Sequence, residues 1–239
     1  MKIKILVILS MLLTQWTSGQ SQKVKIEDVF NRYMHTDDKS LAKLIINSED
    51  GLYSLFCKGE LAENAAERII LFTGFIQQKP KYGLEKAFLN RGIEYYQLEK
   101  TDSALIDFNN SILLDTKEPY AYYFRGASYA SLENYDKAID DYSQAIKINP
   151  DFELAYFMRG NSLYSQKKNE IAINDYNKVI ELNENSDIAY LMRGIVYEAI
   201  GEYKKAISDW KEVKKLKTDN YEQAEKLIEK TNKKLKEKK

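Results

Sequence analysis

The chain has 239 residues, of which 44% are hydrophobic and 30% charged, so it can bury a sizeable core. Only 10 Gly and 3 Pro accompany abundant Leu, Ile, Ala, Lys and Glu, which predicts a mostly helical protein. Lys plus Arg and Asp plus Glu both number 36, so no global charge argues for nucleic acid as a partner. One His and one Cys exclude the usual zinc clusters.

Residues 1–19 are typical of a secretory signal peptide. Lys2 and Lys4 precede the apolar residues 5–14, and Thr17-Ser18-Gly19 supplies small residues for cleavage. Ten residues make a helix of about 15 Å, roughly half of a bilayer's hydrocarbon core, which argues against a permanent anchor. We therefore expect an exported chain, periplasmic or secreted and able to associate with the envelope, with no transmembrane segment after signal removal.

Residues 20–50 form an N-terminal helical segment in this interpretation, with two short amphipathic stretches at 26–33 and 41–46. His35 lies in the turn between them, and Cys57 on the apolar side of the next helix, as a small buried hydrophobe. Residues 51–84 are either a degenerate repeat or an N-terminal cap. Leu55-Phe56-Cys57-Lys58-Gly59 has the same layout as Phe88-Leu89-Asn90-Arg91-Gly92, further along the chain.

Four stretches of similar sequence follow one another at a fixed interval: 85–118, 119–152, 153–186 and 187–218. Each contains an Arg-Gly pair, at Arg91-Gly92, Arg125-Gly126, Arg159-Gly160 and Arg193-Gly194. An alanine lies twelve positions beyond each glycine, and an aromatic residue four further on, at Phe108, Tyr142, Tyr176 and Trp210. These spacings predict two antiparallel helices per repeat, which come close at the glycine and the alanine. Asn134 is a candidate N-cap, and Gly201 is well placed to end a helix.

With Tyr95, Tyr129 and Tyr197 three positions after their glycines, the pattern resembles the tetratricopeptide repeat over residues 85 to about 218. The resemblance implies an all-α, right-handed superhelical solenoid of antiparallel helix pairs. Together with the signal sequence at residues 1–19, it predicts a repeat protein of the exported bacterial type. The N-terminal helices would precede it and a capping helix at 219–239 would close it. The chain departs from the family pattern in having arginine where leucine is expected.

Each of these arginines is followed sixteen positions later by an aspartate, at Asp107, Asp141, Asp175 and Asp209. Antiparallel helices would bring the two charges together, so we predict an Arg–Asp pair in every repeat, within it or across to its neighbour. The alternative is a set of solvated, unpaired charges. We expect such pairs to set the register of the helices rather than to add much net stability.

In proteins that this chain resembles, the first helices of successive repeats line a concave groove that holds a peptide or a partner helix. On these helices, a set of side chains should project away from the second helices: Leu89, Ile93, Tyr96, Tyr120, Tyr123, Ala127, Leu154, Phe157, Asn161, Tyr164, Ile188, Leu191 and Ile195. This set is apolar and aromatic, which favours an apolar helix or an extended segment as ligand. The alternative is that neighbouring repeats cover these side chains and leave no open groove.

No nucleophile motif or phosphate-binding glycine loop is present, so we expect neither catalysis nor a cofactor. The function that the sequence predicts is a non-catalytic scaffold or adaptor for an unidentified protein partner, bound through the concave surface. The alternative is a self-assembling structural component of a cell-envelope complex. The sequence does not indicate an oligomeric state.

Overall fold

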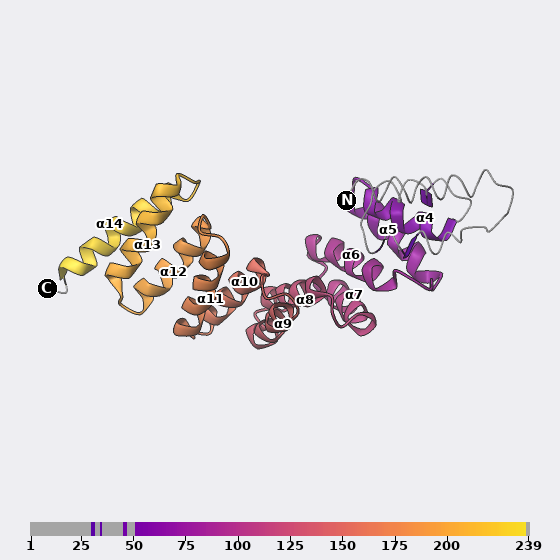
Figure 1. The fold of residues 1–239 in the computed structure, drawn as a ribbon, viewed down its shortest axis with the longest axis horizontal. Coiled ribbons are helices and arrows are strands. Elements are labelled where there is room, and N and C mark those ends of the chain that lie inside the picture. The colour runs from indigo at the N-terminus through magenta and orange to yellow at the C-terminus, as the bar shows by residue number, and fades with distance from the viewer. Residues whose placement is uncertain (1–29, 32–33, 35–44, 47–50, 238–239) are drawn as a thin grey trace, which may run out of the picture. The chain divides into compact units, whose positions relative to one another are not determined.

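The computed structural model describes residues 30–31, 34, 45–46 and 51–237. The predicted signal peptide, His35 and most of the segment 20–50 lie outside these residues. The described chain is all helical (Figure 1). Its helices run in the order α4 (Gly51–Leu61), α5 (Ala65–Gln77), α6 (Leu84–Gln97), α7 (Thr101–Leu114), α8 (Pro119–Ser131), α9 (Tyr135–Ile148), α10 (Glu153–Ser165), α11 (Asn169–Leu182), α12 (Asp187–Ala199), α13 (Tyr203–Leu216) and α14 (Tyr221–Glu237).

The chain divides into two compact units, Met1–Ala87 and Phe88–Lys239. The core of the first unit is rich in phenylalanine and contains Phe30, Met34, Ile45, Tyr53, Phe56, Cys57, Phe72, Phe75 and Ala87. Cys57 is fully buried, as predicted. Burial, with the nearby charge of Glu60, raises the pKa of its thiol to about 12, so the sulfur stays protonated at neutral pH.

The helix pair α4–α5 of the first unit contains one contact of the same kind as those in the four clear repeats. A methyl group at Gly59 on α4 would lie 2.9 Å from Cε1 of Phe72 on α5, so the two helices approach at a glycine and an aromatic ring. Gly59 and Phe72 are nearer to each other in sequence than the equivalent Gly92 and Phe108. This shared contact is compatible with a degenerate repeat at residues 51–84, which stays a prediction.

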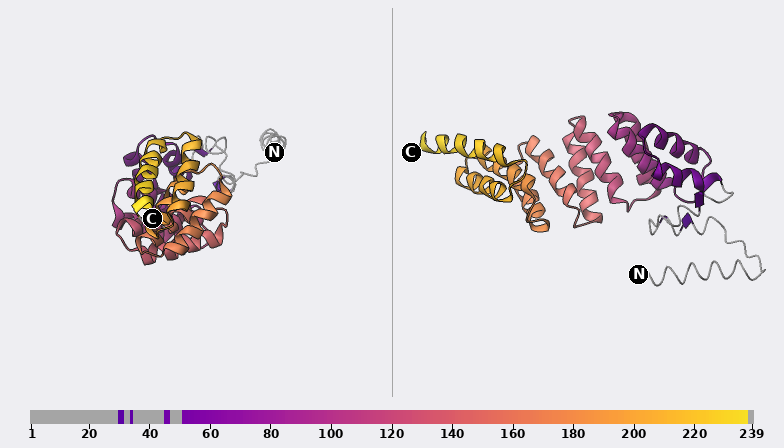
Figure 2. Two further views of the ribbon diagram at one scale, coloured as in Figure 1. Left: turned by 90° about the vertical axis from the view of Figure 1, so that its left-hand side faces the viewer. Right: turned by 90° about the horizontal axis from the view of Figure 1, so that it is seen from above.

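The second unit is built from antiparallel helix pairs that follow one another in chain order (Figures 1 and 2). α8 packs on α9, α10 on α11 and α12 on α13, and each second helix also packs on the first helix of the next pair. The helix pairs predicted from the sequence repeat are therefore confirmed.

In each pair the two helices meet where a glycine faces an aromatic ring. A methyl group at Gly92 would lie 2.7 Å from Cε1 of Phe108, and one at Gly126 or Gly160 would lie 3.0 Å from Cε1 of Tyr142 or Tyr176. Gly194 lies closest of all to its ring, that of Trp210. Any larger residue would push these buried rings out of place.

The ends of the helices follow the expected local chemistry. Asn134 caps α9 by accepting a hydrogen bond from the backbone N–H of Lys137 at 3.3 Å, as predicted. Gly201 follows α12 with a φ of 82°. The equivalent turns of the other repeats place Glu99, Glu133 and Lys167 at φ of 57°, 57° and 61°, a conformation that glycine adopts more readily.

The four predicted Arg–Asp pairs all form, each within its own repeat. Arg91, Arg125, Arg159 and Arg193 each donate Nε–H and Nη2–H to the two carboxylate oxygens of their aspartate, at 2.6 to 2.9 Å. The aspartates are nearly buried and the arginines about one-fifth exposed. The reading of these residues as unpaired solvated charges is therefore wrong.

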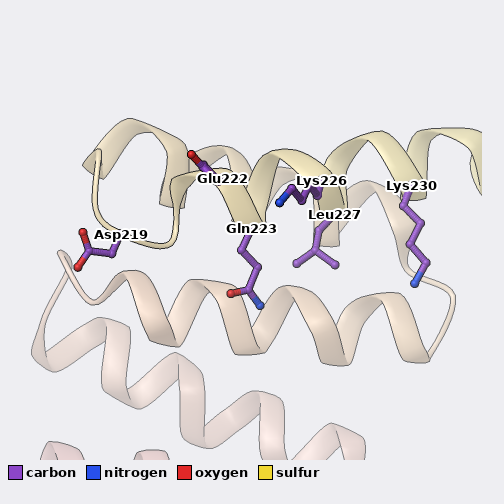
Figure 3. Close-up of a pocket in the computed structure, with 6 residues that line it drawn as sticks. All are labelled: Asp219, Glu222, Gln223, Lys226, Leu227 and Lys230. Carbon is purple, nitrogen blue, oxygen red and sulfur yellow. The ribbon is translucent and has the colours of Figure 1, made fainter.

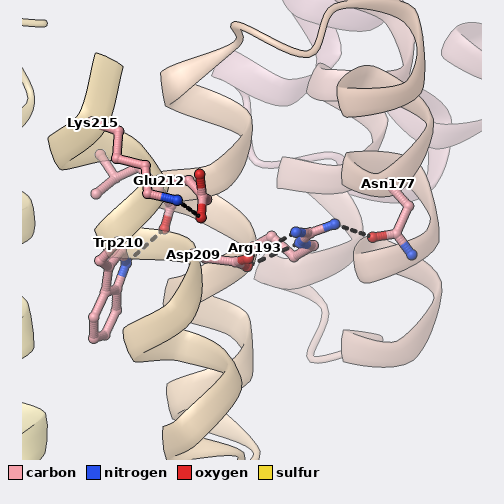
Figure 4. A network of polar contacts seen from close by, with 7 residues as sticks. Asn177, Arg193, Asp209, Trp210, Glu212 and Lys215 are labelled. Atoms are coloured by element: carbon pink, nitrogen blue, oxygen red, sulfur yellow. Dashed lines mark hydrogen bonds and ion pairs between the residues drawn. The ribbon is translucent and has the colours of Figure 1, made fainter. Parts of the chain in front are cut away.

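Three of the arginines also bind the preceding repeat, which the sequence analysis did not foresee. Nη1–H of Arg125, Arg159 and Arg193 donates to a side-chain oxygen on the second helix of the repeat before, at Asn109 Oδ1, Ser143 Oγ and Asn177 Oδ1. Figure 4 shows Arg193 bound to Asp209 on one side and Asn177 on the other. We name these linked pairs the arginine ladder; it ties each repeat to its neighbour.

The arginine ladder fixes the register of the helices more than it adds to the stability of the fold. Burial raises the pKa of the Asp107 carboxyl, although the hydrogen bond and charge of Arg91 act to lower it. The same balance holds for Asp141 and Asp209. Desolvation of the carboxylate thus offsets much of the gain from its arginine, as is typical of ion pairs away from water.

The helix α14 closes the second unit, as predicted. Its Ala224 is fully buried, and Leu227 and Ile228 pack on the cluster that contains Trp210 and Val213. Lys234 forms an ion pair with Glu198 of α12 at 2.7 Å, and Thr231 donates to the same carboxylate at 3.2 Å. The outer residues of α14 are mostly charged, which suits an end helix.

We predict that Gly194→Ala lowers the free energy of unfolding of the second unit by about 1–3 kcal/mol, because the new methyl group overlaps the Trp210 ring. The ring is fixed by the hydrogen bond from Trp210 Nε1 to the Leu191 carbonyl, at 3.2 Å. Urea unfolding followed by circular dichroism measures the change. Gly74→Ala in α5 is the control, since its methyl group would meet only Leu55, at 3.6 Å. Equal midpoints for Gly194→Ala and the parent chain would contradict the prediction.

We also predict that Asp141→Ala destabilises the second unit by about 2 kcal/mol, because it leaves the partly buried Arg125 guanidinium without its carboxylate. Replacing both partners, as Arg125→Met with Asp141→Leu, should bring the stability back to within about 1 kcal/mol of the parent. Chemical unfolding of the three variants tests this. A double variant as unstable as the single one would show that the pair itself is a major source of stability.

Candidate functional site

The thirteen residues predicted to form a groove, which we call the predicted binding face, lie on the first helices α6, α8, α10 and α12. Three are exposed: Tyr120, Leu154 and Ile188. Seven are half-buried, namely Ile93, Tyr96, Tyr123, Phe157, Asn161, Tyr164 and Ile195. None of the thirteen side chains carries a charge at neutral pH.

Three other residues of this face are buried, which corrects their assignment as ligand contacts. Leu89, Ala127 and Leu191 are 7%, 4% and 2% exposed. Leu89 packs with Phe108, and Leu191 with Trp210, so both belong to the cores between helices. Helical spacing identifies the side of a helix on which a residue lies, but not how deeply neighbouring helices cover it.

At the C-terminal end the face is partly covered by α14. Ile195 packs on the cluster that contains Ala224, Leu227 and Ile228. This outcome agrees in part with the alternative that neighbouring elements cover the predicted side chains. The accessible part of the face therefore lies on α6, α8 and α10, with Ile188 on α12.

The three exposed residues occupy the same place in successive repeats. Tyr120, Leu154 and Ile188 are each the second residue of their helix and are 50%, 52% and 40% exposed. Each is separated from the next by one full repeat, which places them on consecutive first helices. They form an apolar row that a partner can contact without any rearrangement of the core.

Next to this row lies a group of aromatic side chains, which we call the aromatic cluster: Tyr96, Tyr120, Tyr123, Phe124, Tyr142 and Phe152. Tyr123 is at its centre, with ring centroids 5.1 Å from Phe124, 5.2 Å from Phe152 and 5.9 Å from Tyr142. Tyr96 lies 6.0 Å from Phe124, and Tyr120 lies 4.9 Å from Phe152. These distances are typical of attractive aromatic pairs.

Two equivalent tyrosines differ in how their hydroxyl groups are bonded. In repeat 153–186, the hydroxyl of Tyr176 donates to Oδ1 of Asn161 at 2.7 Å. In repeat 119–152 the residue equivalent to Asn161 is Ala127, which has no side-chain acceptor. The hydroxyl of Tyr142 is buried and has no hydrogen-bond partner within the described chain.

Two tyrosines of the aromatic cluster have raised pKa values. Burial raises the pKa of Tyr142, and electrostatic interactions with Tyr123, Tyr96 and Asp141 raise it further. Burial also raises the pKa of Tyr123, with a smaller contribution from Tyr96. Tyr142 and Tyr123 therefore stay protonated at physiological pH and can donate hydrogen bonds.

A separate shallow hollow of about 400 Å³ lies along α14 (Figure 3). It is lined by Asp219, Glu222, Gln223, Lys226, Leu227 and Lys230, and none of these belongs to the predicted binding face. Two acidic and two basic side chains offset each other's charge there. This hollow gives no chemical basis for choosing a ligand.

No three His, Cys, Asp or Glu side chains of the described residues are grouped so that they could hold a metal ion. None of the described helices combines the length and the apolar character needed to cross a membrane.

Sequence reasoning missed Phe124, Phe152 and Tyr142 as neighbours of the binding face. Phe124 and Phe152 do not recur at the interval of the repeat, so the repeat gave no sign of them. The repeat pattern placed Tyr142 on the second helix of its repeat, but it predicted neither the contact of its ring with Gly126 nor the one with Tyr123. By contrast, Asn109, Ser143 and Asn177 do recur, each directly after the aromatic residue of a second helix, and could have been found.

We predict that the two tyrosines respond differently to loss of the hydroxyl. Tyr176→Phe should destabilise the protein by about 1 kcal/mol, because it breaks the bond to Asn161. Tyr142→Phe should leave the stability unchanged or raise it by up to about 1 kcal/mol, because it removes a buried hydroxyl without a partner. Thermal and urea unfolding of the matched pair measure both effects. Equal destabilisation by the two changes would show that the Tyr142 hydroxyl is bonded.

Comparisons with known proteins agree with this architecture. A tetratricopeptide repeat model matches residues 119–152 and a TPR repeat model matches residues 160–201. No curated protein matches the chain. Among solved structures, MamA is 23% identical with a TM-score of 0.62, covering 71% of this chain and 96% of that chain.

Two further structures show the same fold. MamA from Desulfovibrio magneticus RS-1, residues 41 to the end, is 17% identical with a TM-score of 0.64, over 75% of this chain and 96% of that one. YrrB, described as a TPR protein with an unusual peptide-binding site, is 21% identical with a TM-score of 0.60, over 69% and 84%. The chain therefore contains tetratricopeptide repeats and has the all-helical fold of these proteins.

Proposed function

We propose that this protein is a non-catalytic scaffold that binds a segment of a protein partner through the first helices of its repeats, on their concave side. The observation that carries the proposal is the row of Tyr120, Leu154 and Ile188, exposed in three successive repeats beside the aromatic cluster. A repeated apolar row of this kind suits a linear partner segment, which runs along successive helices.

The fold supports the same proposal. Tetratricopeptide repeats are present, and YrrB, which shares the fold, is described as having a peptide-binding site. Catalysis finds little support in the residue types available. The thiol of Cys57 is buried with its pKa raised to about 12, so it is unsuited to act as a nucleophile at neutral pH.

The proposal includes export. Its support is the sequence of residues 1–19, in which Lys2 and Lys4 precede an apolar stretch and a small-residue cleavage site. A binding partner is therefore sought in the cell envelope.

The experiment is a pull-down from the envelope fraction with the tagged chain, beside a variant with Tyr120→Glu and Leu154→Glu. We expect the parent to retain a partner, and the variant to recover at least about tenfold less of it, because two charges interrupt the apolar row. Both residues are about half exposed, so the fold should survive. The recovered proteins are identified by mass spectrometry.

The control is Leu113→Glu, which adds a charge at a side chain that is 79% exposed on the second helix α7. It should retain the partner, with helicity equal to that of the parent. Equal recovery by all variants would place the binding site elsewhere. If the parent recovers only further copies of this protein, and the variant with Tyr120→Glu and Leu154→Glu does not, the self-assembling component is favoured instead.

A further inference from the structure

We propose that the aromatic cluster on repeats 85–118 and 119–152 binds an uncharged, extended, proline-rich segment of the partner, whose carbonyl oxygens accept hydrogen bonds from tyrosine hydroxyls. This inference rests on the proposed function and specifies the chemistry of the ligand. The cluster consists of Tyr96, Tyr120, Tyr123, Phe124, Tyr142 and Phe152.

The first observation is the hydroxyl of Tyr142. It is buried without a hydrogen-bond partner in the described chain, whereas the equivalent hydroxyl of Tyr176 donates to Asn161 at 2.7 Å. A buried polar group of this kind normally has a partner, because an unpaired one is destabilising. Since Ala127 stands where Asn161 would supply the acceptor, a bound ligand can supply it instead.

The second observation is the position of the ring that carries this hydroxyl. The Tyr142 ring packs against α8 at Gly126, and its centroid lies 5.9 Å from that of Tyr123. Tyr123 and Tyr96 are half-buried, and both rings pack on Phe124, at 5.1 Å and 6.0 Å between centroids. The proposal includes a turn of the neighbouring Tyr123 side chain that exposes the buried Tyr142 hydroxyl to the ligand.

The chemistry of the cluster selects the kind of segment. The side chains of the cluster are uncharged at neutral pH, so they complement a neutral ligand rather than an acidic or basic one. A helical ligand satisfies its own carbonyls and offers few acceptors to the tyrosines, whereas an extended segment presents free carbonyls.

Proline fits this site better than other residues. It has a carbonyl but no N–H, so it brings no backbone donor that would be left unpaired when it is buried among aromatic rings. Proline-rich segments also hold the extended polyproline conformation before they bind, and therefore lose little entropy. The exposed ring of Tyr120 and the half-buried ring of Tyr123 provide apolar surfaces for the pyrrolidine rings, and the buried Phe152 packs against both.

The test uses fluorescence anisotropy with the full chain and two labelled probes, an uncharged proline-leucine peptide and a neutral helical alanine-leucine peptide of equal length. We expect the proline-leucine probe to bind the more tightly. Tyr142→Phe should weaken its binding about three- to tenfold, the range for one hydrogen bond. Ala127→Asn should weaken it similarly by giving Tyr142 an acceptor within the protein.

The matched control is Tyr176→Phe, whose hydroxyl is already bonded to Asn161, and which should leave the affinity unchanged. Circular dichroism and unfolding of each variant show whether it is folded. The proposal is overturned if Tyr142→Phe and Tyr176→Phe have equal effects, if the helical probe binds the more tightly, or if the proline-leucine probe does not bind.

The two proposals fail in different ways. If the pull-down partner depends on Tyr120 and Leu154 but the proline-leucine probe neither binds nor competes with it, only the assignment of the ligand is wrong. If no partner depends on the exposed row and neither probe binds, the proposed function fails as well.

Discussion

The contact between a glycine on each first helix and an aromatic ring on each second helix is the constraint on which the repeats depend. A ring fits there only because the glycine has no Cβ, as at Gly126 and Tyr142. This contact fixes the position of the two helices relative to each other. It therefore also fixes the positions of the residues that directly precede the glycine and the aromatic residue. The arginine and the aspartate each precede one half of the contact, so their bidentate pairing follows from the same geometry. The arginine ladder then extends the register to the next repeat.

The same contact brings the far end of the Tyr176 side chain to the predicted binding face. The ring of Tyr176 passes Gly160, and its hydroxyl reaches Asn161, the next residue. The ring of Tyr142 passes Gly126 in the same way, but the next residue is Ala127. One structural device thus produces a satisfied hydroxyl in one repeat and an unpaired one in another, and the difference lies in a single residue.

The sequence predicted the helix pairs, the cap at Asn134 and the four Arg–Asp pairs. The helix pairs and the ion pairs depend on spacings that recur in every repeat, and the cap depends on local chemistry. The burial of Leu89 and Leu191 was not predicted, because it depends on the depth to which neighbouring helices cover a face. The aromatic cluster was missed because Phe124 and Phe152 do not recur and meet Tyr123 only in the folded chain. Repeated positions could therefore be predicted, while the unrepeated ones needed the structure.

This division between repeated and unrepeated positions bears on function. The positions of the arginine ladder are nearly identical from repeat to repeat, since every repeat must stack in the same way. On the binding side, equivalent positions instead carry Ala127, Asn161 and Ile195. A surface with the same residues in every repeat would bind a segment equally well after a shift by one repeat. Tyr142 is the one tyrosine of the described chain with an unpaired buried hydroxyl. In the proposed binding mode it sets one preferred register for the ligand, at a small loss of stability in the free protein.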